Sequence, residues 1–186
     1  MSAAREKVVY GHTLESLLRV LGQPLLPEHI EGLQALGVNA RQLEAAYPLE
    51  QYSQVLDFIA TQLGPERSPE EARFALGRAF LAAFRRTTMG KAVHAWTSRF
   101  GPYQTLDQMS RSFRSANNFT ETRLRTLGPG QCELWFNQAG QTDFFRGLLT
   151  EALESEATPG LRVSVLSRDA DGGVTFLITW TELEPR

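Results

Sequence analysis

The sequence is poor in residues that build disulfides and metal sites, and it has no long apolar run. Its 186 residues include one cysteine, Cys132, and three histidines. A single cysteine excludes an internal disulfide, and the scattered histidines lack the spacing of a zinc site. No apolar stretch approaches the roughly 20 residues that span a bilayer, and the first residues lack the apolar stretch of a signal peptide. We therefore expect a cytoplasmic protein with no transmembrane segment, metal or bound cofactor.

Common catalytic and nucleotide-binding motifs are also missing. The sequence contains no Gly-x-Ser-x-Gly, no Walker loop and no Gly-x-Gly-x-x-Gly after a predicted strand. The glycine-rich residues 127–130 join two predicted strands, which is typical of a turn and not of a phosphate loop. Cys132 begins a predicted strand with no base beside it in sequence. We expect a non-enzymatic protein.

Charge is nearly balanced over the whole chain but unevenly distributed along it. The net charge is −2, yet residues 73–125 contain ten basic side chains against two acidic ones, which leaves −10 for the remainder. Of the 19 basic residues, 17 are arginines, whose planar guanidinium binds carboxylate or phosphate groups. If these side chains share one face, they would attract an anionic partner. The alternative is that they lie on solvated helix faces and that the arginine usage reflects codon preference.

The first 115 residues show the 3.6-residue period of amphipathic helices. Thr13 is a predicted N-cap for a leucine stripe that ends at Gly22. Capping boxes at Ser68/Glu71 and Thr105/Gln108 predict two further helix starts. The remaining predicted helices cover residues 27–36, from Pro48 to about 63, and a stretch over 93–100, while the helix that starts after Ser68 runs toward Gly90.

After about residue 116 the apolar period changes to two, which is typical of strands. Residues 119–126 and 131–137 predict one hairpin, and residues 161–168 and 174–181 predict another. A helix whose predicted cap is Thr142 or Asp143 separates them. One face of the last strand carries Val174, Phe176, Ile178 and Trp180. We therefore predict an α+β fold in a single domain, residues 1–186. Its N-terminal helical layer (1–115) precedes a four-stranded antiparallel β-β-α-β-β sheet (116–186), with the helix on one face.

The densest polar cluster lies where the helices give way to the sheet. Two arginines there share a helix face, and a glutamate and an arginine share a strand face. The predicted ligand-binding residues are Trp96, Arg111, Phe113, Arg114, Asn117, Asn118, Glu121 and Arg123. The alternative is that these groups tie the helix end to the sheet edge through arginine–carboxylate and asparagine–backbone bonds.

Two other residues receive a structural interpretation. His94 lies two residues before Trp96 in a predicted helix, so it could ligate a haem, but a lone helical histidine is more often structural or exposed. Gly147 lies inside the helix predicted to pack on the sheet, where glycine costs roughly 1 kcal/mol relative to alanine. We expect a close backbone approach at Gly147, most simply to the sheet.

Six segments carry a family resemblance that extends over nearly the whole chain. They are residues 9–17, 46–49, 76–80, 88–90, 111–114 with 117–118, and 176–180. In these segments the chain resembles the myxobacterial paralogous family of uncharacterised proteins, a domain of unknown function. The resemblance implies no assigned activity.

The order of elements carries a more remote resemblance. Helices followed by β-β-α-β-β, with Phe-Arg-Gly-Leu-Leu at 145–149 in the crossover helix, are similar to one superfamily. It unites haem nitric-oxide sensors, vinyl-reductase-type sensor domains and vesicle-tethering transport-particle subunits. In those relatives the region between helices and sheet holds haem, an aromatic effector or an acyl chain, often in a dimeric sensor or scaffold. The haem sensors' Tyr-x-Ser-x-Arg is replaced here by residues 136–140, and the cysteine set of the zinc-containing domains is missing. We therefore expect neither haem nor zinc.

Two functional hypotheses follow. The first is a non-enzymatic cytoplasmic sensor or adaptor that binds a small apolar or amphipathic molecule between helices and sheet, with Arg111 and Arg114 at the ligand's polar end. The second is a ligand-free interaction module that uses the segregated charges for homodimerisation or docking to a protein partner. Nucleic acid is an unlikely partner, because residues 73–125 contain no recognition motif and interleave their arginines with core positions.

Overall fold

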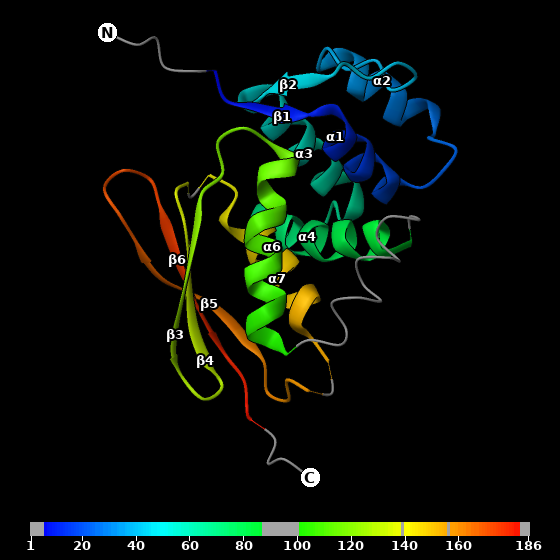
Figure 1. Ribbon diagram of the computed structural model, residues 1–186. Helices are drawn as coiled ribbons and strands as arrows, with labels where there is room; N and C mark the ends of the chain where they lie inside the picture. Colours follow the sequence, from blue (N-terminus) through cyan, green and yellow to red (C-terminus); the bar gives the residue numbers. More distant parts are fainter. Residues whose placement is uncertain (1–5, 87–100, 139, 156, 183–186) are drawn as a thin grey trace, which may run out of the picture.

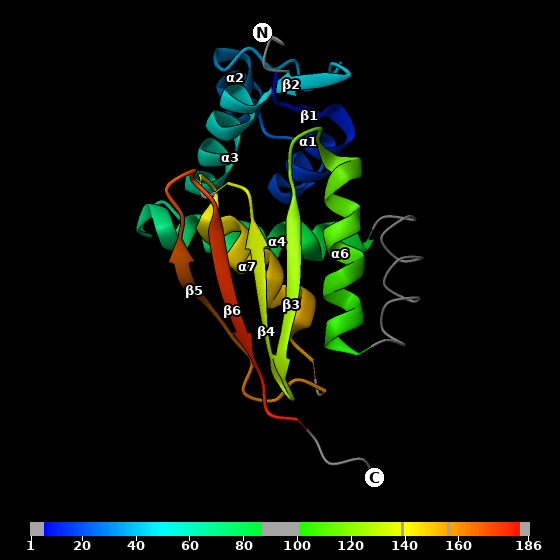
Figure 2. The same ribbon diagram turned by 60° about the vertical axis from the view of Figure 1, so that its left-hand side comes forward.

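The computed structural model describes residues 6–86, 101–138, 140–155 and 157–182. A four-stranded antiparallel sheet forms one layer, the helix α7 (Thr142–Leu153) packs behind it, and α4 (Pro69–Arg86) packs behind α7 (Figures 1 and 2). The helix α6 (Pro102–Ala116) runs beside the first strand of the sheet, and the N-terminal helices cover one end of these layers. The predicted α+β class and the helix on one sheet face are confirmed.

The sheet has the strand order β3-β4-β6-β5, so its two hairpins meet at β4 and β6. Its strands are β3 (Thr122–Gly128), β4 (Gln131–Phe136), β5 (Arg162–Arg168) and β6 (Val174–Thr179). Strict alternation in β4 and β6 turns one set of side chains toward α7. The set consists of Cys132, Leu134, Phe136, Val174, Phe176 and Ile178, all fully buried. Trp180 continues this face at 8% exposure, as the sequence pattern predicts.

The N-terminal part contains three helices and a short two-stranded ribbon. The helices are α1 (Gly11–Leu18), α2 (Pro27–Ala35) and α3 (Leu49–Leu63), and a 3-10 turn, η1 (Arg19–Leu21), follows α1. The strands β1 (Val8–Tyr10) and β2 (Ala46–Pro48) pair antiparallel immediately before α1 and α3. The ribbon therefore joins the starts of two helices. Three-residue strands are too short for a period of two to be read from the sequence.

The helix starts confirm one predicted cap and correct four other predicted starts, among them that of α7, whose N-cap is Gln141 and not Thr142 or Asp143. Ser68 and Glu71 exchange hydrogen bonds as a capping box should, and α4 begins at Pro69. Thr13 instead lies within α1 and donates its hydroxyl to the carbonyl of Ala116 at 3.1 Å. Thr105 likewise lies within α6, which begins at Pro102 after Gly101. For α3 the correction is smaller, because the proline is the N-cap and the helix begins one residue later. The predicted helix over 93–100 lies outside the described residues.

Glycines on α4 and α7 allow these two helices to approach at backbone distance. A Cβ placed on Gly77 would overlap the carbonyl oxygen of Phe144, and one placed on Gly147 would overlap the carbonyl oxygen of Phe74. Both glycines are buried. The expected close approach at Gly147 is confirmed, but its partner is the backbone of α4 and not the sheet. The crossing is reciprocal, since each helix supplies the glycine that admits the other.

None of the described helices combines the length and apolar character needed to cross a bilayer.

Replacing Gly147 by alanine should destabilise the protein although alanine favours helices by about 1 kcal/mol. The added methyl group must push α7 away from α4, and we expect the free energy of unfolding to fall by roughly 2–3 kcal/mol. Urea denaturation followed by circular dichroism measures this. Gly128→Ala is the control, because a Cβ there meets nothing within 4 Å. Equal stability of G147A and the wild type would contradict the crossing.

Cys132 should resist alkylation while the protein is folded. Its side chain is fully buried, and burial raises its pKa from 9.0 to about 11. Iodoacetamide reacts with thiolate, so labelling at pH 8 should be limited by unfolding and should become rapid in guanidinium chloride. Because the folded state holds this proton up to a higher pH, the contribution of Cys132 to stability should be lost as pH rises from 9 to 11. Rapid labelling under native conditions would contradict the burial of this thiol.

Candidate functional site

An apolar pocket lies where the N-terminal helices, α6 and α7 meet the sheet. Its volume is about 60 Å³. Side chains from β1, α1, α3, α4, α6 and α7 and from the two connections that flank the β3–β4 hairpin line it. The lining residues are Val9, Thr13, Tyr52, Phe80, Phe113, Ala116, Asn117, Phe119, Thr120, Gln138, Gln141, Phe144, Phe145 and Leu148. Helices from both halves of the chain and the connections next to the sheet therefore enclose one small space.

Phenylalanine rings form the wall between the pocket and the sheet. The Phe113 ring on α6 lies 5.3 Å from Phe136 on β4 and 5.7 Å from Phe145 on α7, both edge-on. On the opposite side, Phe80 on α4 lies 5.6 Å from Phe144 on α7. Edge-to-face contacts at these distances are favourable beyond the burial of ring area. The wall is therefore ordered by ring contacts that join three helices and the sheet.

Polar side chains occur at one part of the pocket, near the ends of the connecting segments. The Oδ1 atom of Asn117 accepts the backbone N–H groups of Phe119 and Thr120 at 3.1 and 2.7 Å. Gln138 donates from Nε2 to Oγ1 of Thr120 at 3.5 Å. Gln141, the N-cap residue of α7, donates from Nε2 to Ser53 Oγ on α3 at 3.1 Å. The amide oxygen of Asn117 thus accepts hydrogen bonds from the backbone, whereas each glutamine donates one hydrogen bond to another side chain.

The described lining of the pocket is electrically neutral. Among residues 6–86, 101–138, 140–155 and 157–182, no aspartate, glutamate, lysine, arginine or histidine lines it. Tyr52 is its one ionisable lining residue, and complete burial raises the pKa of its hydroxyl well above the ordinary value of 10.0. Burial disfavours the charged form, so Tyr52 stays neutral under ordinary conditions. The surroundings of the pocket favour an uncharged occupant.

The structure divides the predicted ligand-binding residues into separate groups. Phe113 and Asn117 line the pocket, and Trp96 lies outside the described residues. The other members do not line it. Arg111, Arg114, Glu121 and Arg123 are exposed. Arg111 pairs with Asp107 along α6 at 2.8 Å, and Arg123 stacks over the Trp135 ring at 4.6 Å on the face of the sheet away from α7.

The two asparagines of the predicted set tie the end of α6 to the N-terminal ribbon. Asn118 accepts the backbone N–H of Val8 at 2.9 Å and donates to the carbonyl of Glu6 at 2.9 Å. Asn117 forms an isolated antiparallel bridge with Val9. These are the asparagine–backbone bonds of the structural alternative, although the strand that they hold is β1. Both asparagines therefore also hold the start of the described chain, around β1, beside the pocket.

Sequence reasoning identified some lining residues as core and missed others. The helical stripes contain Tyr52, Phe80 and Phe145, but they do not indicate that these side chains border a space. Gln138 and Gln141 lie in a connection without periodicity, and no local pattern distinguishes them from other polar loop residues. Their proximity to Thr120 and Ser53 is created by the tertiary fold.

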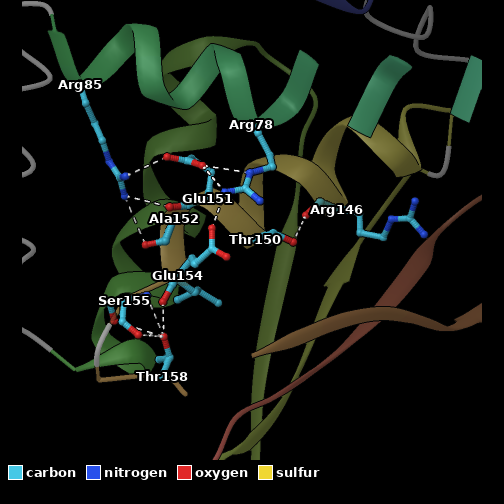
Figure 3. Close-up of polar contacts among 10 residues, drawn as sticks. Arg78, Arg85, Arg146, Thr150, Glu151, Ala152, Glu154, Ser155 and Thr158 are labelled. Carbon is cyan, nitrogen blue, oxygen red and sulfur yellow. Dashed lines mark hydrogen bonds and ion pairs between the residues drawn. The ribbon is translucent and has the colours of Figure 1, made fainter. Parts of the chain in front are cut away.

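Five of the eight arginines that the structure describes within residues 73–125 pair with carboxylates. Arg73 makes a two-pronged contact with Asp57, and Arg125 pairs with Glu133 at 2.7 Å. Arg78 on α4 contacts Glu151 on α7 and Glu154, the C-cap residue of that helix (Figure 3). Carboxylates from outside residues 73–125 thus neutralise several of the positive charges in that segment. Opposite charges that are separated along the sequence therefore lie in contact in the fold.

Arg85, near the C-terminal end of α4, also binds the C-terminal end of α7. Its Nη2 donates to the carbonyl oxygens of Glu151 and Ala152 at 3.1 and 3.4 Å, and its Nη1 lies 3.4 Å from Oε1 of Glu151 (Figure 3). A cation that binds the last carbonyl groups of a helix satisfies acceptors that the helix leaves open. Arg85 therefore caps α7 from α4. We call Arg78, Arg85, Glu151 and Glu154 the arginine clamp.

Comparisons with known proteins give a family and a fold. The family described as "Protein of unknown function (DUF2378)" matches residues 7–181. The Fe(II) unliganded H-NOX protein from K. algicida is 12% identical, with 95% of this chain and 99% of that chain covered and a TM-score of 0.65. An oxygen-binding H-NOX domain related to soluble guanylate cyclases is 14% identical, with 95% and 98% covered and a TM-score of 0.66. No curated protein matches. The family resemblance and the remote one are confirmed, and the fold is H-NOX-like.

The described residues do not fit the haem that some of these structures are described as holding. The pocket of about 60 Å³ is far below the roughly 300–1,000 Å³ typical of cofactor sites. His12 is exposed and His29 is buried on α2, and neither lines the pocket; His94 lies outside the described residues. Tyr52 lines the pocket, but its raised pKa opposes the phenolate that would ligate iron. No cluster of three or more metal-binding side chains occurs in the part of the chain that the structure describes.

Removing the charge of Arg85 should loosen α7 from α4. We expect Arg85→Met, which keeps much of the side-chain volume, to lower the free energy of unfolding by about 1–2 kcal/mol, because two helix-end carbonyls lose a donor. Chemical denaturation measures the change. Arg86→Met is the matched control, since that neighbour is exposed and should stay within about 0.5 kcal/mol of the wild type. Equal losses in both variants would mean that the clamp contributes only general surface charge.

Proposed function

We propose that this chain, which belongs to the DUF2378 family of proteins of unknown function, is a non-enzymatic sensor or adaptor module. It binds a small apolar or amphipathic molecule in the pocket between the helical layer and the sheet. The observation that carries this proposal is the pocket itself, a space of about 60 Å³ lined by phenylalanines, a tyrosine and neutral amides. Apolar concave sites with a few placed polar groups are typical of small-molecule sites.

The size of the pocket limits its occupant. Engineered apolar cavities of about 150 Å³ bind benzene, so 60 Å³ corresponds to a molecule of a few heavy atoms. A larger ligand must displace a ring, and Phe80 and Phe113 are the candidates because both are partly exposed. The ligand is therefore small, or it is admitted by rotation of these rings.

The location of the pocket supports a sensing role. A ligand there would touch Phe80 on α4 and Phe144 and Leu148 on α7, the helices joined by the glycine crossing and the arginine clamp. A ligand shifts a conformational equilibrium by its difference in affinity for the two states. A ligand bound between two closely packed helices favours the helix spacing that accommodates the ligand. The occupied state would thus differ in the arrangement of α4 against α7.

Several parts of this proposal rest on the sequence alone. Hydrocarbon rings and neutral amides supply binding but no pair of general acid and base, so we assign no reaction. The cytoplasm remains the expected compartment. Partner proteins or a second copy of the chain would receive the signal.

The alternative is a ligand-free interaction module. The observation that favours it is the edge strand β5, where the adjacent Val165 and Leu166 are 37% and 49% exposed. β5 pairs with β6 on one side only, and apolar side chains on such an edge strand suit dimerisation or docking of an extended segment. The charge segregation that first suggested this role supports it less, because most of the described arginines of residues 73–125 pair internally.

Propane should bind in the pocket and should be excluded when the pocket is filled. We expect saturable shifts of the Val9 and Ala116 methyl resonances in nuclear magnetic resonance titrations, since both residues line it. Leu148→Phe should abolish them, while Phe80→Ala should enlarge the space and admit benzene. Leu166→Phe on the exposed edge of β5 is the control and should bind propane normally. If wild-type methyl shifts stay linear in propane concentration, or if L148F binds as well as the wild type, the pocket is no ligand site.

A further inference from the structure

We infer that the ligand of this pocket is an uncharged molecule with one hydrogen-bonding end, and that Gln138 and Gln141 bind that end. The inference rests on the proposed function, because it assigns a ligand class to the same pocket. It also replaces the expectation that Arg111 and Arg114 face the polar end, since neither arginine lines the pocket.

The neutral lining sets the charge of the ligand. A carboxylate or ammonium group in this pocket would lose its hydration and find no opposite charge among the lining residues that the structure describes. Transfer of an unpaired ion into an apolar site is strongly unfavourable, whereas a hydroxyl or amide that finds a hydrogen bond is tolerated. Tyr52 cannot serve as a counter-charge, because burial raises its pKa and keeps it protonated. The site therefore selects against ions of either sign.

The hydrogen bonds within the lining show which polar groups remain available. Asn117 accepts two backbone N–H groups through Oδ1, and Thr13 donates its hydroxyl to the carbonyl of Ala116. These bonds hold the backbone and cannot be exchanged without moving it. Gln138 and Gln141 each bond another side chain through Nε2, which leaves their amide oxygens as acceptors for a ligand hydroxyl or N–H.

The two glutamine bonds are also the ones that are easiest to replace. The contact between Gln138 and Thr120 is 3.5 Å long, at the weak limit of a hydrogen bond. Gln141 reaches Ser53, a hydroxyl on the partly exposed face of α3 that also donates to the carbonyl of Leu49. A ligand can therefore gain a bond to either amide at little cost to the protein. Both glutamines come from the connection between β4 and α7, so the polar end of the ligand points toward that connection.

A matched set of small probes tests the ligand class. Propane, ethanol, ethylammonium and acetate are similar in size and differ in their end group. We expect wild-type protein to bind propane and ethanol and to bind the two ions at least about 100-fold more weakly than ethanol. The Val9 and Ala116 methyl resonances report binding, and the side-chain amide resonances of the two glutamines should shift with ethanol but not with propane.

The double variant Gln138→Leu/Gln141→Leu tests the residues. It should weaken ethanol binding by about 3- to 10-fold, the value of one neutral hydrogen bond, while propane binding is unchanged or tighter. Retained propane binding shows that the pocket is intact. Gln104→Leu, on the exposed surface of α6, is the matched control and should change neither affinity.

The outcomes separate the two proposals. If no probe binds to the wild type, the proposed function fails and the inference fails with it. If propane binds but the ions bind as tightly as ethanol, or if the double variant loses no affinity for ethanol, the pocket is a ligand site and the assigned ligand class is wrong.

Discussion

The architecture depends on the close contact between α4 and α7. Gly77 and Gly147 let the two backbones meet, and any side chain at either position would separate them. One face of α7 packs against the sheet while the opposite face meets α4, so the distance from the sheet to α4 is set by this crossing. Phe144, Phe145 and Leu148 reach the pocket from the same helix. The glycine crossing therefore fixes both the layers of the fold and one wall of the candidate ligand site.

Electrostatics reinforces the same contact and explains the unusual charge distribution. Arg78 and Arg85 on α4 face Glu151 and Glu154 at the C-terminal end of α7, so basic residues in the middle of the sequence pair with acidic residues far along the chain. The side chains of Arg78 and Glu154 are 38% and 55% exposed, so their pairing contributes less than a buried pair would. Arg85 differs because it also binds the carbonyl groups at the end of α7. The arginine clamp thus determines the orientation of α7 on α4 more than it increases the total free energy of unfolding.

Local pattern sufficed for much of the fold and for little of the site. Alternation in β4 and β6 indicated the buried face correctly, because one sheet face packs on a helix and the other does not. Thr13 and Thr105 were wrong as caps, since their hydroxyls bond carbonyl groups and the helices begin before them. Gln138 and Gln141 could not be found, because their role depends on neighbours 18 and 88 residues away. Likewise, the arginine clamp joins residues 66 to 76 positions apart.

A crystal structure of the protein under xenon pressure tests the central claim most directly. Xenon binds in dry apolar cavities, and its position is unambiguous in anomalous density. The account predicts one xenon site between Phe113, Phe144 and Leu148, absent in Leu148→Phe crystals treated identically. Xenon-free density at that position, with water or side-chain atoms filling the space, would contradict a ligand pocket between the helices and the sheet.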